Sequence, residues 1–151
     1  MKLEKNLDLL PVSNNCRIAI LGLGYVGLPL AVEFCKRRKC LITGKQLNRF
    51  VIGFDINENR INELNDSFDY TDQFSQNDLK TLDNIKFTSE KNSLIDSDIF
   101  IITVPTPIDK FNIPDLKALK EASILVGQSL SKRNNKNKPV IIYESTVLSL
   151  I

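Results

Sequence analysis

A glycine-rich turn between an apolar run and an amphipathic segment is the feature that most constrains how this chain can fold. Residues 17–21 read RIAIL, the pattern of a short buried strand, and residues 22–27 follow at once with GLGYVG. From Val26 the apolar positions recur at helical spacing, and Pro29 falls in the first turn, where a missing amide donor costs little. The pattern therefore predicts a strand, a tight turn and a helix in direct succession.

Apolar strands continue to alternate with amphipathic helices along the chain. Further strands are predicted at residues 50–54, 85–87, 99–104 and 140–143, and helices at 58–64, 78–82 and from Pro114 to Leu130. Such alternation is typical of a parallel sheet covered on both faces. We expect an α/β fold, a Rossmann-like doubly wound parallel sheet in a single domain, with residues 1–15 as a polar leader and residues 16–151 as the domain.

The glycine turn also predicts an anion site. Gly22 permits the tight turn, Gly24 leaves room for a diphosphate to approach the backbone, and Gly27 lets the helix lie close to the strand. The first amides of a helix lack intrahelical acceptors and lie at the positive end of its dipole, so a diphosphate is stabilised there. The alternative is a glycine-rich turn from strand to helix that holds no ligand.

Asp55 closes the second predicted strand. A carboxylate at this position can accept hydrogen bonds from both hydroxyls of an adenosine ribose and repel a 2′-phosphate, which favours NAD over NADP as the cofactor. Asp55 lies 28 positions after Gly27, whereas the fingerprint expects about 20, and we assign the excess to an insertion in residues 39–49. The alternative role of Asp55 is to cap the helix that begins near Asn57.

Composition argues against several other kinds of site. The 151 residues include no histidine, which disfavours zinc-type metal sites and Ser-His-Asp catalysis, so no metal is expected. Cys16, Cys35 and Cys40 form no CxxC pair, and we expect them to be buried as small apolar residues. The formal net charge of +2 predicts no nucleic-acid or membrane partner, and residues 1–15 lack the apolar core of a signal peptide, which favours a cytoplasmic location.

Four short motifs occur in a fixed order along the chain. They are GLGYVGLPLA at residues 22–31, GFDIN at 53–57 with Arg60 and Ile61 after it, VPTP at 104–107, and ESTV at 144–147. In this order they resemble the UDP-glucose/GDP-mannose dehydrogenase family, over the span from about Cys16 to Val147. The VPTP version is similar to the UDP-N-acetylhexosamine 6-dehydrogenases of bacterial capsule, Vi-antigen and O-antigen synthesis.

The resemblance implies an oxidoreductase that uses two NAD to oxidise the C6 hydroxymethyl of a UDP-N-acetylhexosamine to a carboxylate. It assigns this chain to the family's first, NAD-binding domain, with the catalytic cysteine and most of the sugar-nucleotide pocket beyond Ile151. The chain therefore looks truncated, and we expect it to bind NAD but not to turn over alone. A UDP-sugar would meet it through the missing C-terminal half, and the full-length family member could form a homo-oligomer.

The resemblance also implies roles for individual residues, by motif position. It places the cofactor against Gly22, Gly24, Tyr25, Val26 and Gly27 in the turn, Asp55 and Arg60 at the adenosine end, and Thr106 and Thr146 nearer the nicotinamide. Thr146 would also position a catalytic water. Other roles stay open: Arg60 as a solvated helix charge, Thr106 as part of the proline turn, and Thr146 as a strand-end hydroxyl.

Two other functions fit part of the pattern. One is a non-catalytic dinucleotide-binding or partner-binding fragment, from a split or decayed gene, which would lack the catalytic half altogether. The other is a hydroxyacid-type dehydrogenase domain with the same phosphate loop, but that class does not predict the VPTP and EST stretches together.

Overall fold

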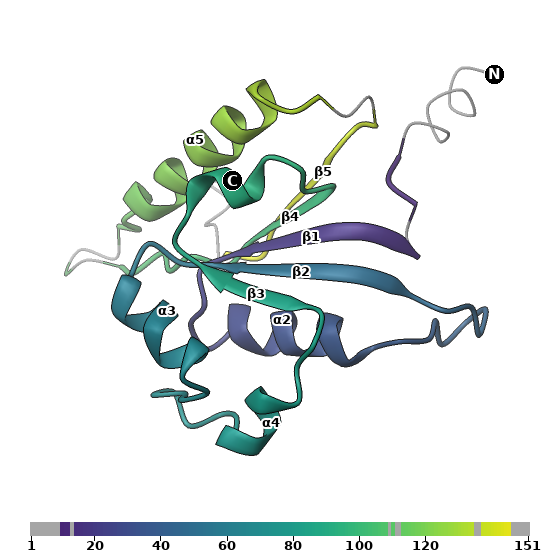
Figure 1. Cartoon of the computed structure of the whole chain (residues 1–151). Coiled ribbons are helices and arrows are strands. Elements are labelled where there is room, and N and C mark those ends of the chain that lie inside the picture. The colour runs from purple at the N-terminus through teal and green to yellow at the C-terminus, as the bar shows by residue number, and fades with distance from the viewer. Residues whose placement is uncertain (1–9, 13, 109, 111–112, 135–136, 146–151) are drawn as a thin grey trace.

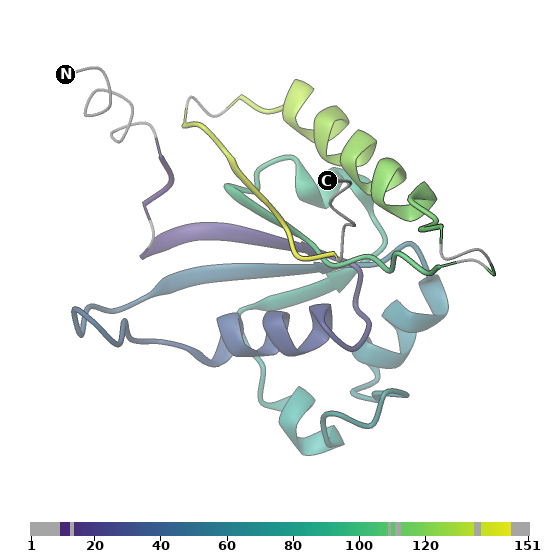
Figure 2. The ribbon, with the colours of Figure 1, turned by 180° about the vertical axis from the view of Figure 1, so that it is seen from behind.

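Parallel strands form a single sheet with helices on both faces (Figures 1 and 2). The computed structural model describes residues 10–12, 14–108, 110, 113–134 and 137–145, and within them the sheet has five strands in the order β3-β2-β1-β4-β5, all parallel. The strands are β1 (Asn15–Leu21), β2 (Asn48–Phe54), β3 (Ile85–Thr88), β4 (Ile99–Ile102) and β5 (Val140–Tyr143). The helices are α2 (Gly27–Lys36), α3 (Glu58–Asn65), α4 (Gln76–Lys80), the 3-10 helix η1 (Lys91–Leu94) and α5 (Lys117–Ser131). The predicted doubly wound parallel sheet in one small domain is confirmed.

Alternate side chains of the sheet supply two separate apolar layers. In β1, Ile18 and Ile20 pack with α2 and α3 on one face, whereas Ala19 and Leu21 pack with α5 and η1 on the other. All four are at most 1% exposed. Both faces of the central strand are therefore buried, which is why its sequence is a continuous apolar run instead of an alternating one.

Most predicted elements are confirmed, with shifted ends. β4 stops at Ile102, two residues before the predicted end, because its partner β1 stops at Leu21, the residue in register with Ile102. The long helix α5 begins at Lys117, whose amide donates to Asp115 Oδ1 at 2.9 Å. The turn η1 is not among the sequence predictions, because its four residues carry no periodic pattern.

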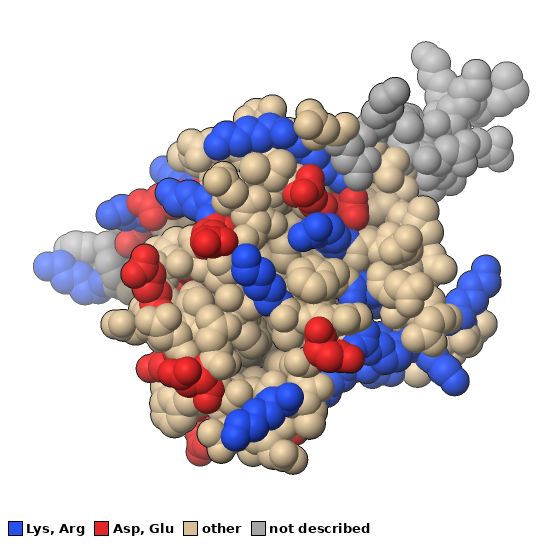
Figure 3. Space-filling model, viewed as in Figure 1, with Lys and Arg blue, Asp and Glu red and all other residues tan. Residues whose placement is uncertain are grey.

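The connection from α2 to β2, predicted as an insertion, is a short hairpin. Lys39 and Gln46 form an antiparallel bridge, and the Gly44 amide donates to the carbonyl of Cys40 at 2.8 Å. Its tip exposes two aliphatic side chains, Leu41 at 84% and Ile42 at 94%. Lys and Arg side chains gather at this end of the molecule (Figure 3).

The cysteines divide into two kinds. Cys16 and Cys35 are buried as expected, but Cys40 is partly exposed because it sits in the hairpin and not under a helix, so the expectation is wrong for this residue. Among the helices of the described residues, none is long and apolar enough to cross a bilayer.

Candidate functional site

The carboxyl ends of the central strands enclose a pocket of about 790 Å³. The chain after β1 passes to α2 on one face of the sheet, whereas the chain after β4 passes to α5 on the other. Doubly wound sheets bind their ligands at such a switch point. The glycine turn, the residues that follow β2 and β4, and one side of α5 line this pocket, whose volume lies in the range of ordinary ligand sites.

Each glycine of the turn meets a different steric requirement. Gly22 has φ +96°, a conformation that side chains rarely adopt, and a Cβ there would lie 3.1 Å from the carbonyl oxygen of Thr103. At Gly27 a Cβ would lie 1.8 Å from the carbonyl oxygen of Gly22, so α2 packs tightly against the turn. A Cβ at Gly24 would meet nothing within 4 Å. Gly24 is therefore the position where the backbone is open to a ligand.

Among the described residues, backbone amides without an acceptor lie between this open position and the start of α2. α2 begins at Gly27, and its N-cap residue Val26 supplies no side-chain acceptor. Within the part of the chain that the structure describes, the amides of Gly24, Tyr25 and Val26 have no hydrogen-bond acceptor. These donors and the positive end of the helix dipole make the turn suited to a diphosphate.

Asp55 follows β2 directly and lines the same pocket. Its Oδ2 accepts from the Leu23 amide at 2.8 Å and its Oδ1 from the Asn57 amide at 2.9 Å. The N-cap of α3 is Asn57, whose side chain accepts from the amides of Asn59 and Arg60, so the alternative role of Asp55 as that cap is wrong. Each carboxylate oxygen has a second lone pair, which leaves Asp55 able to accept from a ribose.

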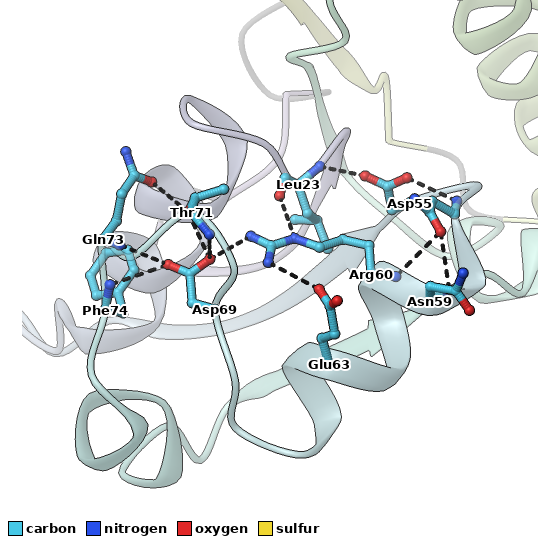
Figure 4. A network of polar contacts seen from close by, with 10 residues as sticks. Leu23, Asp55, Asn59, Arg60, Glu63, Asp69, Thr71, Gln73 and Phe74 are labelled. Atoms are coloured by element: carbon cyan, nitrogen blue, oxygen red, sulfur yellow. Dashed lines mark hydrogen bonds and ion pairs between the residues drawn. The ribbon is translucent and has the colours of Figure 1, made fainter.

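Arg60 is 2% exposed, so the alternative of a solvated helix charge is wrong. Its Nε donates to the Leu23 carbonyl at 2.9 Å and its Nη2 to Asp69 Oδ1 at 2.8 Å (Figure 4). The guanidinium lies 4.3 Å from the centre of the Tyr70 ring, the distance of a cation–π contact. Arg60 thus joins the glycine turn to the segment after α3 and also lines the pocket.

The remaining predicted site residues do not all line the pocket. Tyr25 and Val26 line the pocket at its open rim, where they are 68% and 51% exposed. Thr106 lines the pocket in the stretch after β4. Thr146 lies outside the described residues. Gly27 packs behind the turn against Gly22, as its predicted packing role requires.

Asp69 and Gln73 are polar residues at this site that the sequence analysis does not single out. Asp69 accepts hydrogen bonds from Arg60 and Thr71, and Gln73 Nε2 donates to the Tyr25 carbonyl at 3.2 Å. Both belong to a stretch without periodicity, and Gln73 is 48 positions from its partner. The only signal in the sequence is a set of polar residues in an irregular connection, which is ordinary for a solvated loop.

The fold and the pocket define a dinucleotide-binding α/β domain. Residues 16–149 match the NAD binding domain of the UDP-glucose/GDP-mannose dehydrogenase family, and the chain belongs to this family, as the four motifs predict. The matched domain is the one that binds NAD, so NAD is the cofactor. The acceptor-free amides, the open space at Gly24 and the carboxylate after β2 fit that cofactor.

Several curated relatives are named as nucleotide-sugar dehydrogenases. The chain is 46% identical over 133 residues to Protein CapL of Staphylococcus aureus, which covers 88% of this chain and 27% of that protein. It is 44% identical over 131 residues to UDP-N-acetyl-D-glucosamine 6-dehydrogenase of Pseudomonas aeruginosa, covering 87% of this chain and 27% of that enzyme. The chain therefore spans about 27% of the length of these relatives.

Solved structures of longer dehydrogenase chains contain the same fold. A UDP-D-ManNAc dehydrogenase from Pyrococcus horikoshii aligns with TM-score 0.70 and 31% identity, covering 87% of this chain and 28% of that one. A GDP-mannose dehydrogenase from Pseudomonas aeruginosa aligns with TM-score 0.72 and 26% identity, covering 87% and 29%. A lactate dehydrogenase at 15% identity, covering 88% and 38%, has TM-score 0.56 and shares the fold alone, so the hydroxyacid-dehydrogenase alternative gains no support beyond the fold.

Proposed function

We propose that this chain is the NAD-binding portion of a nucleotide-sugar 6-dehydrogenase that oxidises the C6 hydroxyl of a UDP-N-acetylhexosamine to the uronate with two NAD. The observation that carries the proposal is the meeting, in one pocket, of acceptor-free amides at the start of α2 with the Asp55 carboxylate after β2. The choice of sugar rests on relatives at 44% and 43% identity that are named UDP-N-acetyl-D-glucosamine 6-dehydrogenases.

Each part of the chain has a defined task in this function. NAD, when bound, supplies the hydride acceptor. The amides of Gly24, Tyr25 and Val26 hold the diphosphate, and Asp55 accepts from the adenosine ribose and repels a 2′-phosphate. Arg60 sits at the adenosine end, and Thr106 and Thr146 act nearer the nicotinamide. The chain's task is thereby to bind and orient the cofactor, while the substrate carbon comes from a C-terminal half.

The proposal extends to partners and location. A UDP-sugar reaches the cofactor through a C-terminal half. The full-length protein, which includes that half, can form a homo-oligomer. The cytoplasm is the proposed location.

Cofactor preference tests the role of Asp55. Titration calorimetry should show NAD binding more tightly than NADP to the unmodified chain, and Asp55→Ala should narrow the difference by about tenfold, because the charge that repels the 2′-phosphate is gone. Asp55→Asn keeps an acceptor for the Leu23 amide, so it separates charge from local folding. Asp83→Ala, which removes an exposed carboxylate paired with Arg38, is the matched control. Equal affinities in the unmodified chain would contradict the ribose role.

Turnover tests the activity of the whole enzyme. NAD reduction with UDP-N-acetylglucosamine or UDP-N-acetylgalactosamine is measured with the chain alone and after addition of a separately produced C-terminal portion of the Pseudomonas aeruginosa relative. We expect reduction only in the mixture. Tight NAD binding with no turnover in any mixture would favour the alternative, a non-catalytic dinucleotide-binding fragment.

A further inference from the structure

Two carbonyl groups of the glycine turn are held by side chains from the segment after β2. The Leu23 carbonyl accepts from Arg60 Nε at 2.9 Å, and the Tyr25 carbonyl accepts from Gln73 Nε2 at 3.2 Å. The Leu23 amide is also engaged, by Asp55. These bonds fix the orientation of the Leu23–Gly24 and Tyr25–Val26 peptide groups. The Gly24–Tyr25 group between them is held by the Leu28 amide, which donates to the Gly24 carbonyl at 3.1 Å.

One buried carboxylate organises both donors. Asp69 Oδ1 accepts from Arg60 Nη2 at 2.8 Å and from the Thr71 hydroxyl at 2.6 Å (Figure 4). Its Oδ2 accepts from the amides of Gln73 at 3.0 Å and Phe74 at 3.2 Å. The Asp69 side chain is fully buried. The Asp69 carboxylate therefore positions Arg60 by binding its guanidinium, and positions Gln73 by binding its backbone amide.

We infer that Asp69 is a positioning residue of the dinucleotide site, which acts on the diphosphate through Arg60 and Gln73 without touching it. This inference rests on the proposed function. A phosphate is attracted by amide hydrogens and repelled by carbonyl oxygens, so a turn whose carbonyls are held elsewhere presents only donors to the ligand. Without the two side-chain donors, the Leu23–Gly24 and Tyr25–Val26 peptide groups are free to rotate and to present their carbonyl oxygens to the diphosphate.

The electrostatics of the site agree with this division of tasks. The carboxylates of Asp69, 2.8 Å from Nη2, and Glu63, 3.8 Å from Nη1, neutralise the buried Arg60 guanidinium, and a contact with Tyr70 covers one of its faces. The positive charge of Arg60 is thus balanced within the protein, and the diphosphate depends on correctly oriented backbone amides. Binding of ligands that carry the diphosphate should therefore depend on Asp69 and Gln73 more strongly than binding of the nucleoside alone.

Two variants separate this role from a general stabilising role. Gln73→Met removes the donor to Tyr25 from an exposed side chain, so the fold is expected to survive it. Asp69→Asn keeps the shape of the carboxylate but removes its charge and one acceptor. Asp78→Asn is the matched control, because Asp78 is an exposed carboxylate that caps the neighbouring helix α4 and makes no contact with the turn.

The readout is the affinity for ADP-ribose compared with that for adenosine, which has no diphosphate. Titration calorimetry measures the first and NMR titration the second, with thermal unfolding as the check on folding. We expect Gln73→Met to weaken ADP-ribose binding about two- to tenfold, the worth of one hydrogen bond, and to leave adenosine binding unchanged. Asp69→Asn should weaken ADP-ribose binding at least about tenfold and always more than adenosine binding, while Asp78→Asn changes neither.

Each other result overturns a defined statement. If Gln73→Met folds and leaves ADP-ribose affinity unchanged, or lowers both affinities equally, the positioning role is wrong, although the proposed function stands. If the unmodified chain binds neither NAD nor ADP-ribose, the proposed function fails and the inference falls with it. Gln73→Met keeps the test decisive even where Asp69→Asn does not fold.

Discussion

At the scale of single residues, the glycines of the turn are alike in sequence and differ in what surrounds them. The motif predicts all three, but only the packing shows which one tolerates a side chain. Space is open at Gly24, whereas at Gly27 a Cβ would collide with the backbone of Gly22. Gly24 is therefore required for ligand binding, and Gly27 is required for the packing of the fold.

A pair of alanine substitutions checks this difference. Gly27→Ala should destabilise the domain by about 3 kcal/mol or more, because the clash is with backbone that cannot move aside. Gly24→Ala should leave the free energy of unfolding within about 1 kcal/mol and weaken NAD binding about tenfold or more, since its methyl group occupies the approach of the diphosphate. Chemical denaturation and calorimetry measure the two effects. Similar losses of stability in both variants would contradict the separate roles of Gly24 and Gly27.

The buried pair of Asp69 and Arg60 gives stability a pH dependence. Burial alone would raise the pKa of Asp69, but hydrogen bonds from Thr71 and Arg60 outweigh it and hold this pKa below its ordinary value. A carboxylate with a lowered pKa in the folded state stabilises the fold above its unfolded pKa, and this contribution is lost as the pH falls through the folded pKa.

Asp69→Asn should therefore lower the free energy of unfolding more at neutral pH than in acid. At pH 7 we expect a loss of about 3 kcal/mol, because the variant leaves the buried Arg60 charge with only the more distant carboxylate of Glu63, 3.8 Å from Arg60 Nη1. As the pH falls below about 4, the Asp69 carboxylate of the unmodified chain is protonated first in the unfolded and then in the folded state, so the gap in stability between the variant and the unmodified chain should narrow. Urea denaturation between pH 7 and acid measures the free energy of unfolding of both proteins. A difference between them that does not change with pH would contradict the charged state of Asp69.

Site residues were predictable from the sequence where they follow a strand directly. Asp55 and the glycine turn each lie at the carboxyl end of a strand, where a parallel sheet gathers its ligand-binding groups, so their positions follow from the strand pattern. Asp69 and Gln73 lie in an irregular segment, and their contacts with Arg60 and Tyr25 depend on how that segment folds back. No periodicity encodes such a return.

At the scale of elements, the hairpin between α2 and β2 changes the exposure and the thiol pKa of the cysteine that it contains. The expectation that Cys40 is buried rests on the usual burial of free cysteine, but helix α2 ends at Lys36 and Cys40 lies in the hairpin that follows. Hydrogen bonds from Thr43 lower the pKa of the Cys40 thiol from 9.0 to about 7. By contrast, burial raises the pKa of the Cys16 thiol.

Alkylation rates should rank the three thiols accordingly. The lowered pKa of Cys40 raises its thiolate fraction at pH 7, and the residue is partly exposed, so iodoacetamide should label it first. Cys16 and Cys35 are buried and should react only after unfolding. Mass spectrometry of timed samples, with a denatured sample as reference, measures the order. Labelling of Cys16 or Cys35 ahead of Cys40 in the folded chain would contradict the hairpin geometry.

At the scale of the whole molecule, the strand order places the site. β1 lies in the middle of the sheet, with β2 and β4 on its two sides, so the turn that follows β1 opens between connections that run to opposite faces (Figure 1). The two apolar layers hold α2 and α5 on those faces. The pocket between them is thus a consequence of topology, and its chemistry comes from the residues that close each strand.

The sequence by itself determined the order of strands and helices, the tight turn after β1 and the carboxylate after β2, because periodicity and glycine spacing are local properties of the chain. Only the tertiary structure decided which donors hold the carbonyls of that turn. Arg60 lies 37 positions from Leu23, and Gln73 lies 48 positions from Tyr25. Contacts at such separations arise from the packing of α3 and the segment after it against the turn, and side-chain packing, not local propensity, sets that geometry.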